Sequence, residues 1–158
     1  MKLEPIFTVK ENKLYKIADG TLVNTNNLKK INIPWSTVEI EDGVYNEEFL
    51  ALLRDELKKM EETGIFAVLV PIVDKTLETP EQEESFINAF NHTARRVKDC
   101  VSVAGFILPD QIAAKGFEAG SPAADFMETL AIKHAQYVYF VSKNAASLGN
   151  LPDNIATI

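Results

Sequence analysis

Short hydrophobic runs alternate with amphipathic segments along most of this 158-residue chain. Three of the runs, at residues 31–34, 66–71 and 103–109, end in proline, and these prolines are 37 and 38 residues apart (71 − 34 and 109 − 71). Since proline cannot donate a hydrogen bond within a central strand, it belongs where a strand stops. A fourth run, at residues 137–141, has no proline. Evenly spaced apolar strands separated by helical segments predict a parallel sheet that is covered on both faces.

The segments between the runs predict three helices. Residues 46–62 carry apolar side chains at helical spacing, and Asn46 is a typical cap for the start of such a helix. Thr79 precedes a proline and is followed three residues later by Gln82, which predicts a capping box at the start of the second helix. Ser121 and the proline after it begin the third. The chain therefore reads as a series of β-strand–α-helix units.

The two ends of the chain differ from this middle part. Residues 6–9 and 13–17 alternate apolar and polar positions around Glu11-Asn12, which predicts a β-hairpin. A turn at Asp19-Gly20 leads to residues 21–23, which would make a fifth strand if they joined the sheet. The tail after Asn144 resembles a short helix or coil. We expect a single domain over residues 1–158, divided into an N-terminal hairpin and lead-in at 1–27, βα units at 28–144 and a C-terminal tail at 145–158.

Composition narrows the classes of function. The apolar fraction is 46% without a run long enough to span a membrane, the start lacks a secretory signal, and the lone Cys100 suits a reducing compartment, so we expect a cytoplasmic protein. A net charge of −7 without a basic stripe argues against nucleic acid as a partner. Two histidines and one cysteine are too few for a structural zinc site, and no phosphate-binding motif is present. No cofactor or membrane partner is expected.

Two segments carry a resemblance to a known family. The stretch DGVYNEEFLALLRDELKKMEETGIFAVLV is similar to the unit that runs from the second to the third barrel strand of cellulase- and mannanase-type glycoside hydrolases of family five and its clan. The stretch FINAFNHTARRVKDCVSVAGFILPDQI resembles the next unit, and FTVKENKLYKIADGTLVNTN resembles the hairpin that leads into the barrel. The resemblance implies a truncated, degenerate relative with a partial, TIM-barrel-like α/β fold of about four to five mostly parallel strands. A flavodoxin-like open sheet is the alternative.

The same resemblance implies that most of the active site is missing. Asn32 stands where family members place an arginine, and Ile72-Val73-Asp74 stands where they place a histidine. The acid/base glutamate falls on Asp110, and Pro109 replaces the asparagine before it. The nucleophile belongs to a seventh strand, whereas this chain stops shortly after what resembles the fifth.

Candidate site residues follow from these positions. Asp110 is the first catalytic candidate, and Asp74 or Glu39 is the second carboxylate that glycoside cleavage would require. Solvated loop acids or capping groups are the alternative interpretation of these residues. Trp35 comes directly after a strand and could stack on a sugar ring or fill the core. Together with Asn32 and Gln111, Trp35 makes up the predicted ligand-binding set.

About four parallel strands cannot close a barrel of eight. An open sheet could flatten, its edge could be covered by the hairpin or the tail, or two chains could associate as a homodimer through the exposed edge; we favour association, alone or with cover by the tail. The leading functional hypothesis is a non-catalytic glycosidase-like domain for binding a ligand, such as a carbohydrate, or for assembly. The alternative is a small hydrolase that uses Asp110 with a second rim carboxylate, and a third possibility is a metal site at Asp74 and Asp110.

Overall fold

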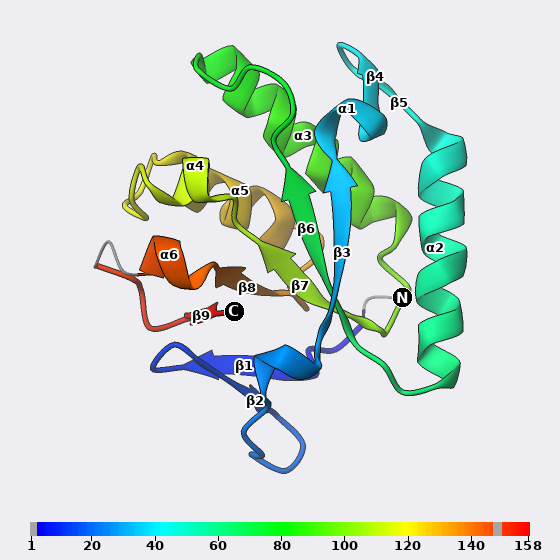
Figure 1. Cartoon of the computed structure of the whole chain (residues 1–158), viewed down its shortest axis with the longest axis vertical. Coiled ribbons are helices and arrows are strands. Elements are labelled where there is room, and N and C mark those ends of the chain that lie inside the picture. Colours follow the sequence, from blue (N-terminus) through cyan, green and yellow to red (C-terminus); the bar gives the residue numbers. More distant parts are fainter. Residues whose placement is uncertain (1–2, 147–149) are drawn as a thin grey trace.

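A five-stranded parallel sheet forms the centre of the molecule, in the strand order β3-β6-β7-β8-β9 (Figure 1). The computed structural model describes residues 3–146 and 150–158. The sheet strands are β3 (Lys29–Pro34), β6 (Ala67–Ile72), β7 (Val103–Ile107), β8 (Val138–Val141) and β9 (Ile155–Thr157). Two antiparallel pairs lie beside it, β1 (Phe7–Lys10) with β2 (Lys13–Lys16) and β4 (Glu39–Glu41) with β5 (Val44–Tyr45). The helices are η1 (Thr25–Asn27), α1 (Trp35–Val38), α2 (Glu47–Glu62), α3 (Pro80–Arg96), α4 (Asp110–Ala113), α5 (Pro122–Ala131) and α6 (Lys143–Ala146).

The prediction of parallel strands that end near proline is confirmed. β3, β6, β7 and β8 pair in parallel, Pro34 ends β3, and Pro109 follows β7. Pro71 lies one residue before the end of β6, opposite Ile33. The strands follow each other across the sheet without the reversal of order that defines a doubly wound fold, so the architecture is an open part of a barrel and not flavodoxin-like.

The predicted helix starts are also confirmed. The Asn46 side chain accepts a hydrogen bond from the backbone N–H of Phe49 at the start of α2. Thr79 and Gln82 form the capping box of α3, and Ser121 caps α5. These caps satisfy backbone donors that the first turn of a helix leaves unpaired. They fix where α2, α3 and α5 begin.

One face of the sheet, here called the outer face, packs against these helices. Strand residues such as Ile33, Leu69 and Phe106 join side chains of α2, α3 and α5 in one large buried cluster. Aromatic rings form its centre, with Phe126 of α5 in ring contact with Phe106. The outer face therefore carries most of the buried apolar surface that stabilises the fold.

The opposite face, here called the inner face, is covered by the N-terminal hairpin. Phe7 and Leu14 of the hairpin pack with Val68, Ala104 and Phe140 of the sheet in a second, smaller cluster. In a closed barrel the inner faces of opposite strands would fill this space. Here the β1–β2 hairpin takes their place.

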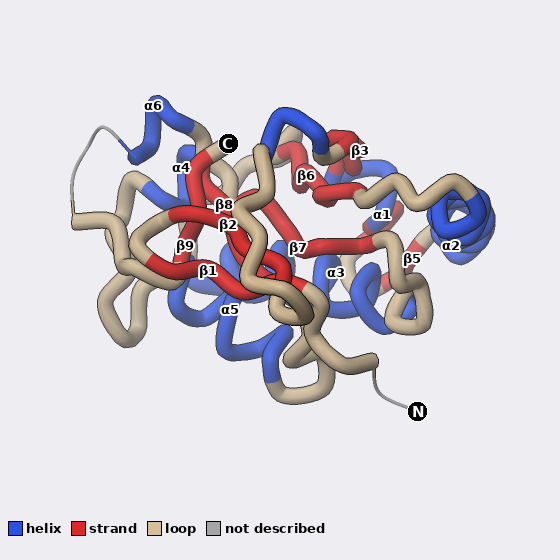
Figure 2. The backbone as a smooth tube through the Cα atoms, turned by 90° about the horizontal axis from the view of Figure 1, so that it is seen from below, coloured by secondary structure: helices blue, strands red, loops and turns tan. Residues whose placement is uncertain are grey.

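The turn of the hairpin is joined to the last strand. Asn12 has a positive φ of 65°, as a tight hairpin turn requires. Its backbone N–H donates to the carbonyl oxygen of Asp153 at 3.0 Å, and its side-chain nitrogen donates to those of Pro152 and Ile155 at 2.7 and 2.8 Å. The hairpin thus contacts the β9 end of the sheet, whereas α2 lies at the β3 end (Figure 2).

The fifth strand is not the one that the sequence suggested. Residues 21–23 do not join the parallel sheet, because Leu22 forms an isolated antiparallel bridge with Tyr15 of the hairpin. The fifth strand is instead β9, in the tail that we expected to be a short helix or coil. α6 supplies the helix, and β9 covers the edge of β8.

Gly105 allows β7 and β8 to pair closely. A Cβ atom at this position would lie 1.7 Å from the backbone oxygen of Val138. The register between β6 and β7 also shifts here, so that Ala67 pairs with Val103 and Val68 with Gly105. The glycine therefore marks an irregularity in the middle of the sheet where two backbones approach closely.

Candidate functional site

The predicted site residues lie at one end of the sheet, here called the rim. In parallel strands all C-terminal ends point the same way, and ligands of such folds gather there. β3 leads into α1 with Trp35, β6 leads into the loop with Asp74, and β7 leads into α4 with Asp110. Ser142 follows the end of β8. The sequence order of these elements thus brings the candidates to a single rim.

Trp35 and Glu39 form a buried pair at the β3 end of the rim. Trp35 is 2% exposed and packs edge-on against Phe86 of α3, with ring centroids 5.2 Å apart. Glu39 is 3% exposed and accepts hydrogen bonds from Trp35 Nε1 at 2.8 Å and from the backbone N–H of Gly43 at 3.0 Å. Lys75 Nζ lies 3.2 Å from Glu39 Oε1 and 4.8 Å from the centroid of the Trp35 ring. Trp35 is therefore part of the core, and the Glu39 carboxylate is held by three donors.

Asp74 lies exposed in the loop that follows β6. Its Oδ1 accepts a hydrogen bond from the backbone N–H of Ser36 at 2.9 Å, and its Oδ2 accepts one from the Ser36 hydroxyl. Ser36 belongs to the first turn of α1. The Asp74 carboxylate therefore connects two neighbouring strand ends by binding a backbone N–H group that the short helix leaves unpaired.

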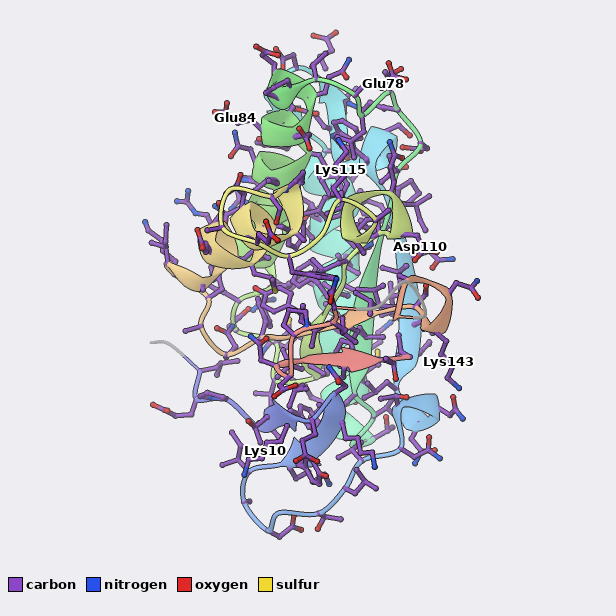
Figure 3. All side chains as sticks on the ribbon, turned by 90° about the vertical axis from the view of Figure 1, so that its left-hand side faces the viewer. Lys10, Glu78, Glu84, Asp110, Lys115 and Lys143 are labelled. Atoms are coloured by element: carbon purple, nitrogen blue, oxygen red, sulfur yellow. The ribbon has the colours of Figure 1, made fainter. Side chains whose placement is uncertain are left out.

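Asp110 is the first residue of α4 and is exposed. Its Oδ1 accepts a hydrogen bond from Ser142 Oγ at 2.7 Å, and Ser142 Oγ in turn accepts from the backbone N–H of Ala145 at 3.1 Å. Figure 3 shows Asp110 and Lys143 on the same side of the molecule, where α4 and α6 meet. The acid/base candidate thus connects the ends of β7 and β8.

The two remaining candidates differ in their surroundings. Gln111 Nε2 donates to the carbonyl oxygen of Leu77 at 3.0 Å, which joins α4 to the loop before α3. Asn32 is exposed on β3, between Ile31 and Ile33, which both face the outer cluster. Because side chains alternate along a strand, Asn32 faces the inner side of the sheet. Asn32 is the ligand-binding candidate on the open part of the inner face.

The rim brings the three acids to one end of the sheet but into separate contacts. Within the described part of the chain, no hydrogen bond joins Asp110 to Asp74 or Glu39. A hollow of about 420 Å³ at the rim is lined by Trp35, Glu39 and Lys75, among others, and neither Asp74 nor Asp110 lines it. Over residues 3–146 and 150–158, no group of three His, Cys, Asp or Glu side chains is placed to hold a metal ion.

Three partners of the rim acids were not predicted from the sequence. Lys75 neighbours the buried carboxylate of Glu39, Ser36 holds Asp74, and Ser142 holds Asp110. Ser142 lies directly after β8, Lys75 is next to Asp74, and Ser36 lies two residues beyond the end of β3. Polar residues at strand ends were a usable signal for Ser142, which follows the fourth hydrophobic run. No local pattern joins Glu39 to Lys75, because their contact depends on the pairing of β3 with β6.

Comparison with known proteins finds solved glycoside hydrolase structures with a similar fold. No family model and no curated protein matches the sequence. The solved structure of endo-glycoceramidase II from Rhodococcus sp. with a cellobiose-like imidazole is 16% identical with a TM-score of 0.61, over 83% of this chain and 47% of that one. GH5_18 from Streptomyces cattleya in complex with GlcNAc is 9% identical with a TM-score of 0.54, over 73% and 35%.

These matches confirm the resemblance to family-five glycoside hydrolases at the level of the fold. A third structure, GH5_18 from Bifidobacterium longum subsp. infantis, is 11% identical with a TM-score of 0.52, over 71% of this chain and 33% of that one. The chain therefore spans about half the length of the glycosidases it resembles, or less. Within the residues that the structure describes, none of the helices has the length and apolar character that a membrane crossing requires.

Proposed function

We propose that this chain is a non-catalytic glycosidase-like domain that acts by binding a ligand, such as a short carbohydrate, and by assembly. The observation that carries the proposal is the use of each rim carboxylate as a connector between neighbouring strand ends. Glu39 is held by Trp35, Gly43 and Lys75. Asp74 and Asp110 each accept a hydrogen bond from a serine hydroxyl. Carboxylates used in this way stabilise the frame of the rim.

The chemistry of glycoside cleavage supports this interpretation. A retaining enzyme needs two carboxyl groups about 5–5.5 Å apart, and an inverting enzyme needs them about 6.5–9.5 Å apart, on either side of the bond that is cut. Asp110 is the candidate acid, but its carboxylate accepts a hydrogen bond from the hydroxyl of Ser142. Glu39, one of the two proposed partners, is buried, and its carboxylate already interacts with three donor groups of the protein. Both carboxylates are thus engaged by groups of the protein itself.

The binding surface in this proposal is the part of the inner face that the hairpin leaves uncovered. Asn32 is exposed there, and Val70 and Ile72 of β6 are half-buried on the same side. An amide next to apolar side chains matches the mixed polar and apolar faces of a sugar. Gln111 lies at the adjoining rim. We propose Asn32 as the first contact of a carbohydrate on this surface.

Assembly in this proposal uses the free edge of β3. In the part of the chain that the structure describes, β3 has a strand partner on one side only, while the contacts of Asn12 protect β9 at the other edge of the sheet. The backbone N–H of Lys29 donates to Phe66 before β6. Since backbone donors alternate along a parallel strand, those of Lys30 and Asn32 point outward. Two copies could pair these edges about a twofold axis.

The test of catalysis compares the full chain with Asp110→Asn on aryl β-glycosides, with Asp55→Asn on the exposed face of α2 as a matched control. We expect no release of the aryl group by any of the three proteins. Release by the wild type and by Asp55→Asn that disappears in Asp110→Asn would favour the alternative, a hydrolase that uses Asp110 with Asp74 or Glu39. Titration with cellobiose by calorimetry tests binding, and Asn32→Ala should weaken it.

The test of assembly is size-exclusion chromatography with light scattering. We expect a dimer for the wild type and for Asn32→Ser. Asn32→Pro should be monomeric, because proline removes an outward N–H group without disturbing the hydrogen bonds to β6. A monomeric wild type, or a dimer that survives Asn32→Pro in a folded protein, would reject the β3 edge as the interface.

A further inference from the structure

A second hollow lies at the base of the sheet, the end opposite the rim. It has a volume of about 470 Å³ and is lined by three cationic side chains, Arg95, Lys98 and Lys133, and by the apolar side chains of Leu3 and Ile132, among others. Arg95 is in the last turn of α3, and Lys133 follows the end of α5. Ile132 is 74% exposed, which is unusual for a large apolar residue. The hollow therefore combines positive charge with an accessible apolar surface.

A neighbouring hollow between α2 and α3 provides a direct contrast. It shares Arg95 and Lys98 with the basal hollow, but its other cations, Arg96 and Arg54, each have a carboxylate partner. Arg96 Nε donates to Glu47 at 2.8 Å, and Arg54 Nε donates to Asp99 at 3.2 Å. These arginine hydrogen bonds lower the pKa of both carboxyl groups below their ordinary values. Two of the four cations that line that hollow are therefore paired with carboxylates of the protein itself.

The lining of the basal hollow includes no carboxylate that could pair with its cations. Across residues 3–146 and 150–158, no ion pair joins Arg95, Lys98 or Lys133 to a carboxylate. Acidic residues outnumber basic ones by 23 to 16 in this chain, so a hollow with three cations and no carboxylate stands out from the surface average. The dipole of α3 accounts for arginine in its last turn but not for Lys98, which lies beyond the helix. Three gathered cations would be stabilised by an anion from outside.

We propose that the basal hollow binds a small organic oxyanion, a carboxylate, phosphate or sulfonate that carries an apolar group. The oxyanion lies between Arg95, Lys98 and Lys133, and the apolar group lies on Ile132 and Leu3. The site is independent of the proposed function at the rim, because it lies before the N-terminal ends of β7 and β8, whereas Asp110 and Ser142 lie after their C-terminal ends. Either site can fail without the other.

The experiment titrates the full chain with 8-anilinonaphthalene-1-sulfonate, which joins a sulfonate to an aromatic group, and follows its fluorescence and the heat of binding. We expect saturable binding of one molecule that weakens with added salt and is displaced by an alkyl phosphate. The double variant Arg95→Gln/Lys98→Gln should lower the affinity at least about fivefold, as expected for two partly solvated charge contacts. Ile132→Ser should weaken the aromatic probe more than it weakens inorganic phosphate.

Matched controls make the result decisive. Lys13→Gln/Lys59→Gln removes the same charge from exposed positions elsewhere, and it should change the affinity less than about twofold. Circular dichroism and thermal unfolding establish that each variant is folded. Equal losses in both double variants would show a general charge effect and overturn the site. Absence of saturable binding, or binding seen only with anionic lipid vesicles, would overturn it as well.

Discussion

The two faces of the sheet differ in how much apolar surface they bury. The outer face packs against three capped helices and buries a continuous set of aromatic rings from α3, α5 and the strands. The inner face packs against a single hairpin, and its buried cluster is much smaller. Asn32, Val70 and Ile72 stay at least partly exposed on that side. The same strands therefore carry a complete core on one side and a partial cover on the other.

This difference explains how an open part of a barrel can be stable. The outer face has the layer of helices that any parallel βα array has, so its packing does not depend on closure of a barrel. On the inner face of the described structure, a local hairpin with Phe7 and Leu14 occupies the place that the opposite strands take in a closed barrel. We infer that the outer face supplies most of the free energy of unfolding, and the inner face supplies the surface that is free to interact.

The largest effect on stability is expected at Gly105, in the middle of the sheet that lies between the two faces. Gly105→Ala places a methyl group 1.7 Å from the backbone oxygen of Val138, so β7 and β8 must separate. We expect the free energy of unfolding to fall by at least about 3 kcal/mol, measured by urea denaturation. Ala104→Gly at the neighbouring position is the control and should cost only about 1 kcal/mol. A Gly105→Ala protein of wild-type stability would disprove the close approach of the two strands.

Two buried phenylalanines, one on each side of the sheet, allow the packing of the two faces to be compared directly. Phe126 on the outer side and Phe140 on the inner side are both fully buried. We expect Phe126→Ala to lower the free energy of unfolding by about 3–5 kcal/mol. Phe140→Ala should cost less, about 2–3 kcal/mol, because the hairpin can move into the cavity. Equal costs in denaturant titrations would show that the inner core is as tightly packed as the outer one.

The attachment of the hairpin is tested at Asn12. Asn12→Ala removes two side-chain hydrogen bonds to the β9 region and leaves alanine at a positive φ, so we expect a loss of about 2 kcal/mol in the free energy of unfolding. Asn12→Gly removes the same bonds without the backbone strain and should cost about 1 kcal/mol. Amide hydrogen exchange should speed up in β1, β2 and β9 in both variants and stay unchanged in β6.

The smallest effect concerns the ion pairs on the helical side. Arg96 and His92 hold the pKa of the Glu47 carboxyl below its ordinary value of 4.5. A lowered pKa in the folded state means that this group adds stability above pH 4.5 and loses it as the pH falls through the lowered value. Because Glu47 is exposed, we expect less than about 1 kcal/mol, seen as a smaller stability difference between pH 6 and pH 3 in Glu47→Gln. A variant whose pH dependence matches the wild type would show that solvent screens the pair completely.

Much of the fold was predictable because the signals are local. Proline near the strand ends, the Asn46 cap and the Thr79–Gln82 capping box each depend on residues close together in sequence, and each is confirmed. β9 was missed because a strand of three residues has no periodicity of its own and is defined by pairing with β8. Residues 21–23 have the better strand pattern but bond to the hairpin instead. Tertiary pairing decided between them.

At the candidate site, too, features set by local sequence were predictable and those set by tertiary packing were not. The position of Asp74, Asp110 and Trp35 at strand ends follows from the order of strands and loops, so the common rim was predictable. Their hydrogen bonds were not, because those to Ser36 and Ser142 join residues 38 and 32 positions apart. The burial of Trp35 depends on where Phe86 of α3 lies. Such contacts are properties of the packed layers and have no counterpart in the local sequence.

The bonds between Asn12 and the β9 region have a consequence for the route of folding. They join residues as far as 143 positions apart, so the hairpin cannot complete its contacts until the far part of the chain is available. During synthesis, β6, α3 and β7 can already assemble from neighbouring contacts, and the hairpin can reach Phe66 and Val68, whereas its attachment to β9 must wait. We therefore expect the joining of the two chain ends to be a late step, and a nascent chain held short of residue 150 should keep part of its apolar inner face exposed to chaperones.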